Sequence, residues 1–459
     1  MRTESMKQTL GSGIARREFM QRSAIAAATS AMIVPRHVLG QGQTPPSEKL
    51  NIAGIGIGNK GKGDVISVES ENIVALCDVD PDYAAKTIQR YPKAKFYTDY
   101  REMLEKEKGI DAVMIATPDH THAAIAMAAI QCGKHVYCQK PLTHDIYQAR
   151  TLAKAARESK VCTQMGIQGH AEEGIRLVTE WLQAGAIGDV SEVDAWDHCS
   201  VYPLTQNHLG YAPDNLRRPT DQPPVPPRMN WDLWIGPAQM RPYHPNYIRT
   251  KWLAWWDFGT GMLGGRGVHT MDPVVTALKL ELPEIIDATA LDVNLDTYPL
   301  AQVVTYRFAA RPHMPAVKLN WYDGMQAPLP LDLEDGRKLP DDGVVLNGTK
   351  GTLVCGMYGS SPRIVPETRM KEFLSTRPPK TLLRIPGGIY ADWIRSCKKG
   401  TRACADFEYS AKLTEICLLG LIATRMKSRI RWDAPNMRVT NLEAANRYVK
   451  PEYRQGWSL

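Results

Sequence analysis

The sequence predicts an α/β protein that opens with a doubly wound parallel sheet. Two observations predict it. Between residues 50 and 165, short apolar runs of the kind that form buried strands alternate with segments of helical composition. The first apolar run also leads directly into a glycine-rich turn, Gly56-Ile57-Gly58-Asn59-Lys60-Gly61. Strand–helix alternation at this spacing is the pattern of a parallel sheet with helices on both faces.

The length of 459 residues predicts two or three domains, and 43% hydrophobic and 23% charged residues exclude wholesale disorder. The formal net charge is +7, of which residues 1–40 contribute +4. The rest of the chain has no basic stripe, so we expect no nucleic-acid partner. No run of about 18 apolar residues is present, so we expect no membrane span.

Residues 50–55 form the first expected strand, and the turn after it fits the pattern G-x-G-x-x-G. Gly56 permits the tight turn, Gly58 lets the backbone approach a pyrophosphate, and Gly61 allows the next helix to pack close to the strand. The helix that begins there presents N–H donors to the anion, and Asn59 lies in the same turn. The turn therefore predicts a dinucleotide site.

A second apolar run, 73–77, ends at Asp78, which lies 17 residues after Gly61. A carboxylate at this place accepts hydrogen bonds from the adenosine ribose and repels a 2′-phosphate, so NAD is expected and NADP is less favoured. The remaining elements place the first domain over residues 48–170, with strands at 110–116, 135–138 and 161–165 and helices at 100–106 and 123–131.

The first 40 residues have the features of an export signal. Arg16 and Arg17 precede the apolar pair Phe19 and Met20, and a weakly apolar segment follows at 24–34. Paired arginines ahead of such a segment indicate the twin-arginine route. We therefore expect a signal peptide over residues 1–40, the twin-arginine export machinery as a partner, and a periplasmic or otherwise exported location. The alternative is a helical N-terminal extension with chance arginines.

The nine cysteines are odd in number and contain no C-x-x-C pair. Neither a disulfide framework nor a zinc ribbon is expected, and free, mostly buried thiols suit a chain that folds in the reducing cytoplasm. No metal site is expected either, because these histidines show no ligand spacing: His198, His208, His244 and His313.

Three longer strings follow the glycine turn in order. They are Ala116-Thr117-Pro118-Asp119-His120-Thr121-His122, Gly133-Lys134-His135-Val136-Tyr137-Cys138-Gln139-Lys140-Pro141-Leu142 and Gly261-Met262-Leu263-Gly264-Gly265-Arg266-Gly267-Val268-His269-Thr270-Met271-Asp272. With the stretches 97–104 and 347–353, they resemble the Gfo/Idh/MocA oxidoreductase family over nearly all of residues 49–459. That family includes glucose–fructose oxidoreductase and inositol dehydrogenase. The added export signal resembles its secreted branch.

The resemblance implies an N-terminal Rossmann domain and a C-terminal α/β domain, residues 171–459. The second domain is expected to carry a large, mostly antiparallel open sheet that covers the nicotinamide. Residues 442–449 are expected to form a helix, and in relatives a comparable segment returns toward the first domain. Strand-like stretches compatible with the sheet lie at 189–196, 285–293, 301–308, 315–321, 343–346 and 352–355.

Hydride transfer from an alcohol carbon needs a base for the hydroxyl proton and a cation near the developing alkoxide. In the family a Glu-Lys-Pro string supplies a lysine at the nicotinamide, and here the string is Gln139-Lys140-Pro141. The resemblance implies that Lys140 is catalytic and contacts both cofactor and substrate. Gln139 carries no charge, so the lysine pKa is expected to differ from that of Glu-bearing relatives. The alternative for Lys140 is a solvated surface lysine.

His269 matches the family's histidine, and we expect it to be catalytic and to bind substrate. The family's aspartate four residues earlier is absent, because that position is Gly265. Arg266 adds a positive charge that could bind a carboxylate or a sugar hydroxyl. Asp272 is a further substrate-binding candidate, although family precedent favours a structural role. The alternative for His269 is a buried, hydrogen-bonded histidine.

The resemblance also implies a set of residues along the cofactor. Thr117, Pro118 and His122 match positions that line it, His120 is a less direct neighbour, and Gln139 lies beside Lys140. His122 could equally brace its loop. Gln168 is a further candidate for a ligand contact.

The segment 212–229 is rich in proline and predicts an extended arm. Five of the eleven tryptophans follow within 26 residues. Aromatic faces suit sugar rings, and Trp255 and Trp256 are the expected stacking residues because they lie just before the His269 string. The alternative is packing in the core or between subunits. Several relatives form dimers or tetramers, so we expect a homo-oligomer, which the proline arm could help to hold.

Three functions remain open. The leading one is an exported NAD-dependent oxidoreductase that acts on a sugar, glycoside or polyol and keeps its cofactor bound. The second is a glycosidase with bound NAD that oxidises C3, eliminates the aglycone, adds water and reduces again. The third is a non-catalytic sugar-binding protein. Net NADH formation favours the first, glycoside turnover without added NAD the second, and sugar binding with neither the third.

Overall fold

The computed structural model describes residues 48–197, 217–299, 301–324, 327–376, 378–457 and 459. The expected signal peptide, residues 1–40, lies outside the described residues, as do residues 212–216 of the proline arm, His198, Cys199 and His208. Residues 50–459 form one compact unit. No helix within the described ranges is both long and apolar enough to cross a bilayer.

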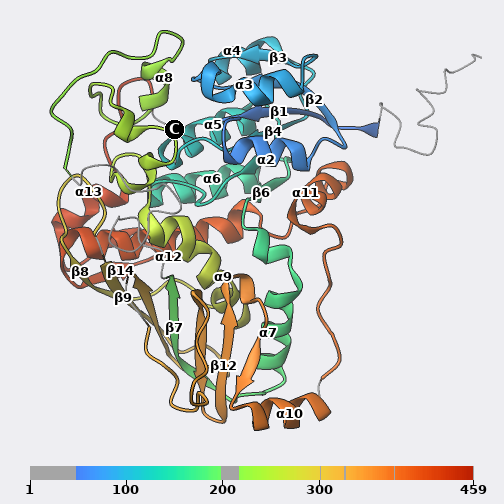
Figure 1. The fold of residues 1–459 in the computed structure, drawn as a ribbon, viewed down its shortest axis with the longest axis vertical. Coiled ribbons are helices and arrows are strands. Elements are labelled where there is room, and N and C mark those ends of the chain that lie inside the picture. The colour runs from blue at the N-terminus through green and yellow to red at the C-terminus, as the bar shows by residue number, and fades with distance from the viewer. Residues whose placement is uncertain (1–47, 198–216, 300, 325–326, 377, 458) are drawn as a thin grey trace, which may run out of the picture. The chain divides into compact units, whose positions relative to one another are not determined.

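The first sheet has six strands in the order β3-β2-β1-β4-β5-β6, all of them parallel. Its central strands are apolar and buried because helices cover both faces. Figure 1 shows these helices around the sheet, which confirms the doubly wound fold. The strands are β1 (Asn51–Ile55), β2 (Asn72–Cys77), β3 (Lys95–Tyr97), β4 (Ala112–Ile115), β5 (His135–Cys138) and β6 (Thr163–Met165). The helices are α2 (Lys60–Ser67), α3 (Pro81–Arg90), α4 (Tyr100–Lys106), α5 (Asp119–Gln131) and α6 (Ile146–Glu158).

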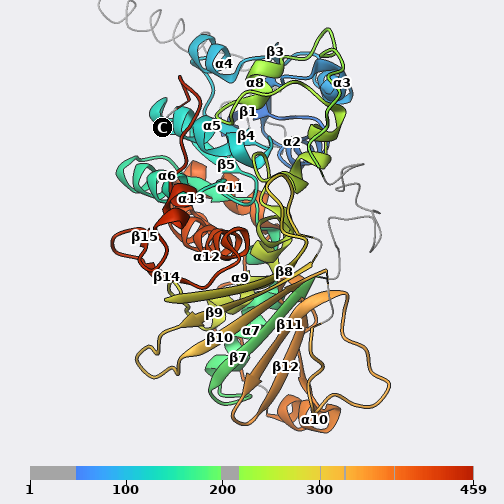
Figure 2. The same ribbon diagram turned by 90° about the vertical axis from the view of Figure 1, so that its left-hand side faces the viewer.

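The second sheet has nine strands in the order β13-β12-β11-β7-β10-β9-β8-β14-β15. Only the pair β7 and β10 is parallel among the pairs described, which confirms the mostly antiparallel open sheet. Figure 2 shows the strands of this sheet fanned out, with α7 and α9 next to them. The strands are β7 (Val190–Asp197), β8 (Ile285–Leu291), β9 (Ala301–Phe308), β10 (Val317–Asp323), β11 (Asp342–Gly348), β12 (Gly351–Gly356), β13 (Arg363–Val365), β14 (Ile430–Asp433) and β15 (Arg438–Val439).

Helix α12 (Phe407–Met426) lies between the two sheets, next to α6 (Figure 1, Figure 2). Its apolar residues are spread around the helix instead of forming one stripe, and most of its residues are buried. The helix expected at 442–449 is instead a 3₁₀ turn, Glu443–Ala445, followed by α13 (Asn446–Val449). The other helices are α7 (Glu173–Gln183), α8 (Trp231–Ile235), α9 (Val268–Ala277), α10 (Glu367–Ser375) and α11 (Gly388–Lys399).

The cysteines within the described ranges are free thiols. No group of His, Cys, Asp or Glu side chains in these ranges has an arrangement that could hold a metal ion.

Candidate active site

A cavity of about 500 Å³ lies at the carboxyl ends of the parallel strands. It begins at the glycine turn after β1 and the end of β2, passes the start of α5 and the segment after β5, and reaches α9 of the second domain. The strand order of the first sheet reverses between β1 and β4, and ligands of open α/β sheets bind at this point. The topology therefore positions the cavity as the ligand site.

The glycine turn has room for backbone alone. Gly56 has a φ of +73°, and a Cβ on Gly61 would lie 1.8 Å from the carbonyl oxygen of Gly56. A Cβ on Gly58 would lie 2.3 Å from the ring of Tyr83. Asn59 caps the start of α2 by position, makes no side-chain capping bond and lines the cavity. The turn thus fits the pyrophosphate of a dinucleotide, as the sequence predicts.

Asp78 lies at the end of β2 on the cavity wall. Its carboxylate accepts hydrogen bonds from the backbone N–H of Ile57 over 2.8 Å and of Asp80 over 3.0 Å. Burial raises the pKa of Asp78 to about 6, against the effect of these hydrogen bonds. A carboxylate fixed beside the glycine turn suits the ribose of NAD.

His122 braces the cavity wall. Its ring nitrogens lie 2.9 Å from the carbonyl oxygens of Thr117 and Pro141, which ties the loop after β4 to the loop after β5. Burial lowers the pKa of His122 to about 4, so the neutral ring carries one N–H and donates to only one of these two carbonyls. Thr117, Pro118 and His122 all line the cavity.

His120 points away from this cavity, which corrects its expected place beside the cofactor. Its two ring nitrogens lie 3.2 Å from the carbonyl oxygen of Phe258 and 3.0 Å from that of Trp234. Successive helical residues differ by about 100° in direction, so His120 and His122 face different neighbours.

Lys140 is half-buried at the far end of the cavity, just after β5. Its Nζ donates to the carbonyl oxygen of Gly265 over 2.8 Å. Gly265, which occupies the place of the family's aspartate, therefore supplies a backbone carbonyl from the π-helical turn Leu263–Gly267. Burial lowers the pKa of Lys140, with Asp119 opposing and Arg266 adding to this effect. A lysine of lowered pKa is suited to proton transfer.

His269 lies in α9 on the same cavity wall and is 5% exposed. Its Nδ1 is buried and has no hydrogen-bond partner within the part of the chain that the structure describes. Burial, with the charges of Lys140 and Arg266, lowers the pKa of His269 well below its usual range. The ring is thus a neutral imidazole with a free nitrogen, and the alternative of a fully bonded core histidine is not what the structure shows.

Tyr358 is a cavity residue that the sequence did not indicate. Its ring meets that of His269 edge-on, with centroids 5.0 Å apart, and it lines the cavity. Its φ is +66°, a conformation that costs a non-glycine residue energy and is concentrated at functional sites. No sequence pattern indicates Tyr358, because its position depends on the 3₁₀ turn Met357–Gly359.

Arg266 lines the cavity but is already held by two carboxylates. Its Nε donates to Asp197, and its Nη2 donates to Asp342 over 2.9 Å. Both acidic residues belong to strands of the second sheet, β7 and β11. The guanidinium is therefore fixed in place, and it supplies positive charge near Lys140.

Gln139 belongs to a buried network that the sequence did not reveal. Its Nε2 donates to Oδ2 of Asp64 over 2.9 Å. The other carboxylate oxygen of Asp64 accepts from Lys60 Nζ over 2.5 Å and from the Tyr390 hydroxyl over 2.6 Å. Gln168 accepts from the same Nζ over 3.3 Å. Asp64 on α2 thus supplies a buried carboxylate beside the Gln-Lys-Pro string, and the i, i+4 spacing of Lys60 and Asp64 was its only signal.

Asp119 is a second buried carboxylate near the reacting end. It accepts a hydrogen bond from Thr260 over 2.6 Å and lines the cavity. Burial raises its pKa to about 7, opposed by the Thr260 hydrogen bond and by the charge of Lys140. Its place directly after Thr117 and Pro118 could have indicated it.

Trp255 and Trp256 lie outside this cavity, which corrects their predicted role in stacking on the substrate here. Trp255 is fully buried and donates through Nε1 to the carbonyl oxygen of Asn246. Trp256 packs on Tyr298 instead. The aromatic segment does reach the cavity, but through Trp234 and Trp252.

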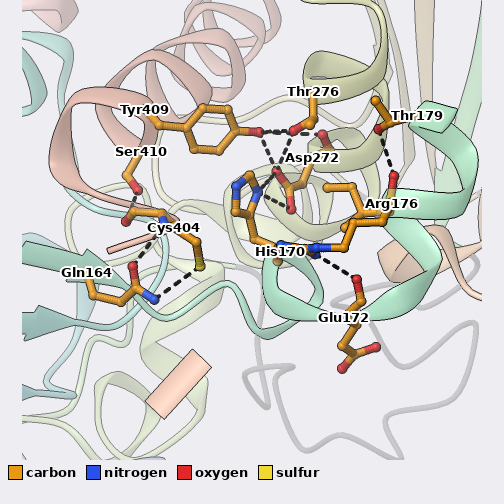
Figure 3. A network of polar contacts seen from close by, with 12 residues as sticks. Gln164, His170, Glu172, Arg176, Thr179, Asp272, Thr276, Cys404, Tyr409 and Ser410 are labelled. Atoms are coloured by element: carbon orange, nitrogen blue, oxygen red, sulfur yellow. Dashed lines mark hydrogen bonds and ion pairs between the residues drawn. The ribbon is translucent and has the colours of Figure 1, made fainter. Parts of the chain in front are cut away.

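Asp272 also lies outside the cavity, which corrects its candidacy for the substrate and agrees with a structural role. Figure 3 shows its carboxylate between His170 and Tyr409. Oδ1 lies 2.8 Å from Nδ1 of His170 and accepts from the Tyr409 hydroxyl. The contacts of Asp272 with His170 and Tyr409 thus join α9, α12 and the turn Gln168–Ala171.

Comparison with known proteins agrees with this geometry. Residues 50–167 match the family described as "Oxidoreductase family, NAD-binding Rossmann fold", and residues 217–459 match its C-terminal alpha/beta domain. The chain belongs to the Gfo/Idh/MocA oxidoreductase family. Its first domain is accordingly an NAD-binding Rossmann domain.

Among individual proteins, levoglucosan dehydrogenase of Pseudarthrobacter phenanthrenivorans is 28% identical over 115 residues, which cover 25% of this chain and 29% of that protein. A glycosyl hydrolase family 109 protein of Shewanella pealeana is 26% identical over 208 residues, 39% of this chain and 45% of that one. The chain thus matches less than half the length of these curated relatives. The structure of WlbA dehydrogenase from Bordetella pertussis in complex with NADH and UDP-GlcNAcA has a TM-score of 0.59 at 16% identity and covers 84% of this chain and 98% of its own, a likeness of fold.

Proposed function

We propose that the protein is an NAD-dependent oxidoreductase that transfers a hydride between the nicotinamide and a hydroxyl-bearing carbon of a sugar, glycoside or polyol. The observation that carries the proposal is the shared cavity. Half-buried Lys140 and neutral His269 lie at one end of it, and the glycine turn and Asp78 lie at the other. Relatives named as dehydrogenases of levoglucosan and inositol support the substrate class.

When bound, NAD supplies the nicotinamide carbon that exchanges the hydride. The residues of the chain then handle the proton. Lys140, whose pKa is lowered by burial, accepts in its unprotonated form the proton of the substrate hydroxyl at Nζ while the Gly265 carbonyl holds that nitrogen in place. The free Nδ1 of His269 hydrogen-bonds the same hydroxyl. Arg266, fixed by its two carboxylates, stabilises the developing alkoxide.

The direct experiment uses the purified chain, its bound nicotinamide, and a panel of hexoses, inositols, anhydrosugars and aryl glycosides. The absorbance band of reduced nicotinamide and product analysis are followed together. We expect one substrate class to yield a keto-sugar with stoichiometric reduced cofactor. Sugar binding without either product would instead indicate a non-catalytic sugar-binding protein. Failure to bind NAD at all would contradict the proposal.

A glycosidase that uses NAD without net redox change is the second candidate. The similarity to a glycosyl hydrolase family 109 protein favours it, since that match covers 39% of this chain. Oxidation at C3 makes the C2 proton acidic, so elimination of the aglycone needs a further base beside Lys140. His269 supplies one, with Tyr358 beside it. Release of the aglycone while the cofactor returns to its starting state would select this reaction.

We further propose that residues 1–40 direct export through the twin-arginine route and that the protein acts outside the cytoplasm as a homo-oligomer. The paired arginines Arg16 and Arg17 support export. The test replaces both by lysine and compares cell fractions. We expect the exported pool to disappear while the cytoplasmic pool stays folded, and an unchanged distribution would contradict the proposal. Light scattering of the mature chain measures the oligomeric state, and a monomer would refute that part.

A further inference from the structure

A second cavity, of about 800 Å³, lies apart from the cofactor cavity and shares no lining residue with it. Its walls come from the start of α6, the loop 237–239, the last turns of α12 and the segment 447–453. Figure 2 shows α12 beside the short helix α13, which belongs to that segment. Trp256 and Tyr298 form part of the wall, so one of the tryptophans predicted to face a ligand lies here.

Arg425 is the unusual residue of this cavity. Its guanidinium lies between two aromatic rings, 4.9 Å from the centroid of Trp256 and 4.2 Å from that of Tyr448. Its Nε is buried without a hydrogen-bond partner, and no carboxylate of the described residues forms an ion pair with it. Burial lowers the pKa of Arg425. Arg425 as a whole is half-buried, and holding a partly desolvated guanidinium without a counterion costs free energy, which the two rings offset only in part.

Two further cations lie in the lining beside Arg425. Arg447 and Lys450 also line it, and neither pairs with a carboxylate of the described chain. Of its three acidic residues, Asp257 pairs with Arg241, Asp145 accepts from the Tyr453 hydroxyl over 2.9 Å within the cavity, and Glu452 is exposed to solvent. The lining thus presents a cluster of cationic donors and one N–H without a hydrogen-bond partner.

We propose that this cavity binds a small organic anion whose carboxylate or phosphate group pairs with Arg425. Guanidinium groups recognise both oxyanions through paired N–H donors, and Arg447 and Lys450 add attraction at the entrance. Asp145, Tyr453 and the aromatic wall offer hydrogen bonds and apolar contact to the rest of the molecule, so a polyol acid or its phosphate ester suits the site. The site is independent of the hydride-transfer reaction.

The test is calorimetric titration of the full chain, saturated with NADH so that the pyrophosphate turn is filled. Sodium gluconate and inorganic phosphate are the two probes, and sodium chloride at equal ionic strength is the blank. We expect saturable binding of at least one probe. Binding of gluconate identifies a carboxylate ligand, and binding of phosphate alone identifies a phosphate.

Variants assign the binding to this cavity. Arg425→Gln is expected to weaken it about tenfold or more, because a charge-assisted pair is lost. Arg447→Gln, at an exposed position, is expected to weaken it less and serves if Arg425→Gln does not fold. Arg429→Gln is the matched control, because Arg429 follows the same helix but pairs with Asp287. No saturable binding of either probe, or wild-type affinity in both cavity variants, would overturn the proposal and leave Arg425 a helix-end residue.

Discussion

Replacing Gln139 by glutamate places a second carboxylate against a buried one. In the wild type, Nε2 of Gln139 donates to Asp64 over 2.9 Å, and Asp64 is fully buried. Two unit charges about 3 Å apart repel by about 5 kcal/mol at an effective dielectric constant of about 20. Taking up one proton avoids this repulsion and costs a glutamate about 4 kcal/mol at pH 7. Lys60 already neutralises part of the charge.

We therefore expect Gln139→Glu to lower the free energy of unfolding by about 2–4 kcal/mol at pH 7 and by about 1 kcal/mol at pH 5. The sign follows from the raised pKa of the new carboxyl. The folded chain binds the proton more tightly than the unfolded chain, so stability is lost as the pH rises. Urea unfolding followed by tryptophan fluorescence at both pH values measures the difference.

The companion variant Asp64→Asn tests whether the two side chains act as a pair. In the Gln139→Glu background, the new amide at position 64 can donate to the new carboxylate, while its carbonyl still accepts from Lys60 and Tyr390. The double variant should recover most of the lost stability at pH 7. A fully stable Gln139→Glu chain, or a double variant no better than the single one, would refute the reasoning.

Three further predictions concern single side chains. Asp78→Ser should weaken NAD binding about tenfold and raise the preference for NADP over NAD, because the variant loses both the acceptors for the ribose hydroxyls and the repulsion of a 2′-phosphate. Fluorescence titration with each cofactor measures both affinities, and an unchanged preference would contradict the prediction. Burial raises the pKa of Asp323 to about 7, so its contribution to stability declines as the pH rises from about 4 to 7. Asp323→Asn should flatten the pH dependence of the free energy of unfolding in this range, by at most about 4 kcal/mol, and an unaltered slope argues against it. Tyr358→Phe should lower kcat/KM about 3- to 10-fold and leave the NAD affinity unchanged, because one hydrogen bond to the substrate is lost. Full activity of the variant would place the Tyr358 hydroxyl away from the substrate.

Local patterns predicted the first domain well. The spacing of Gly56, Gly58 and Gly61 demands the close backbone approach that the structure shows, and Asp78 follows a strand whose end is fixed by the sheet. Lys140 likewise lies where a strand ends at the ligand edge of the sheet. Such positions depend on neighbours in the sequence, which is why sequence could find them.

The sequence did not predict which way side chains point or which residues far apart in the chain are in contact. His120 and His122 are two residues apart, but only His122 faces the cofactor cavity, since each helical step turns the direction by about 100°. Trp255 and Trp256 lie in the expected segment, although packing of the second domain turns both away from the cavity. The partner of Gln139 lies 75 residues earlier, and only the folded sheet brings the two together.

The most direct test of the central claim is the single-turnover rate of bound-nicotinamide reduction in wild type, Lys140→Met and Lys134→Met, with a sugar that the panel identifies. Lys134 lies outside the cavity, where its Nζ donates to the carbonyl oxygen of Lys108 over 3.1 Å, and serves as the matched control. We predict that Lys140→Met binds NAD as the wild type does but reduces it about 10²- to 10⁴-fold more slowly, as expected for loss of a general base, while Lys134→Met behaves as the wild type. Reduction at the wild-type rate in Lys140→Met would contradict the account.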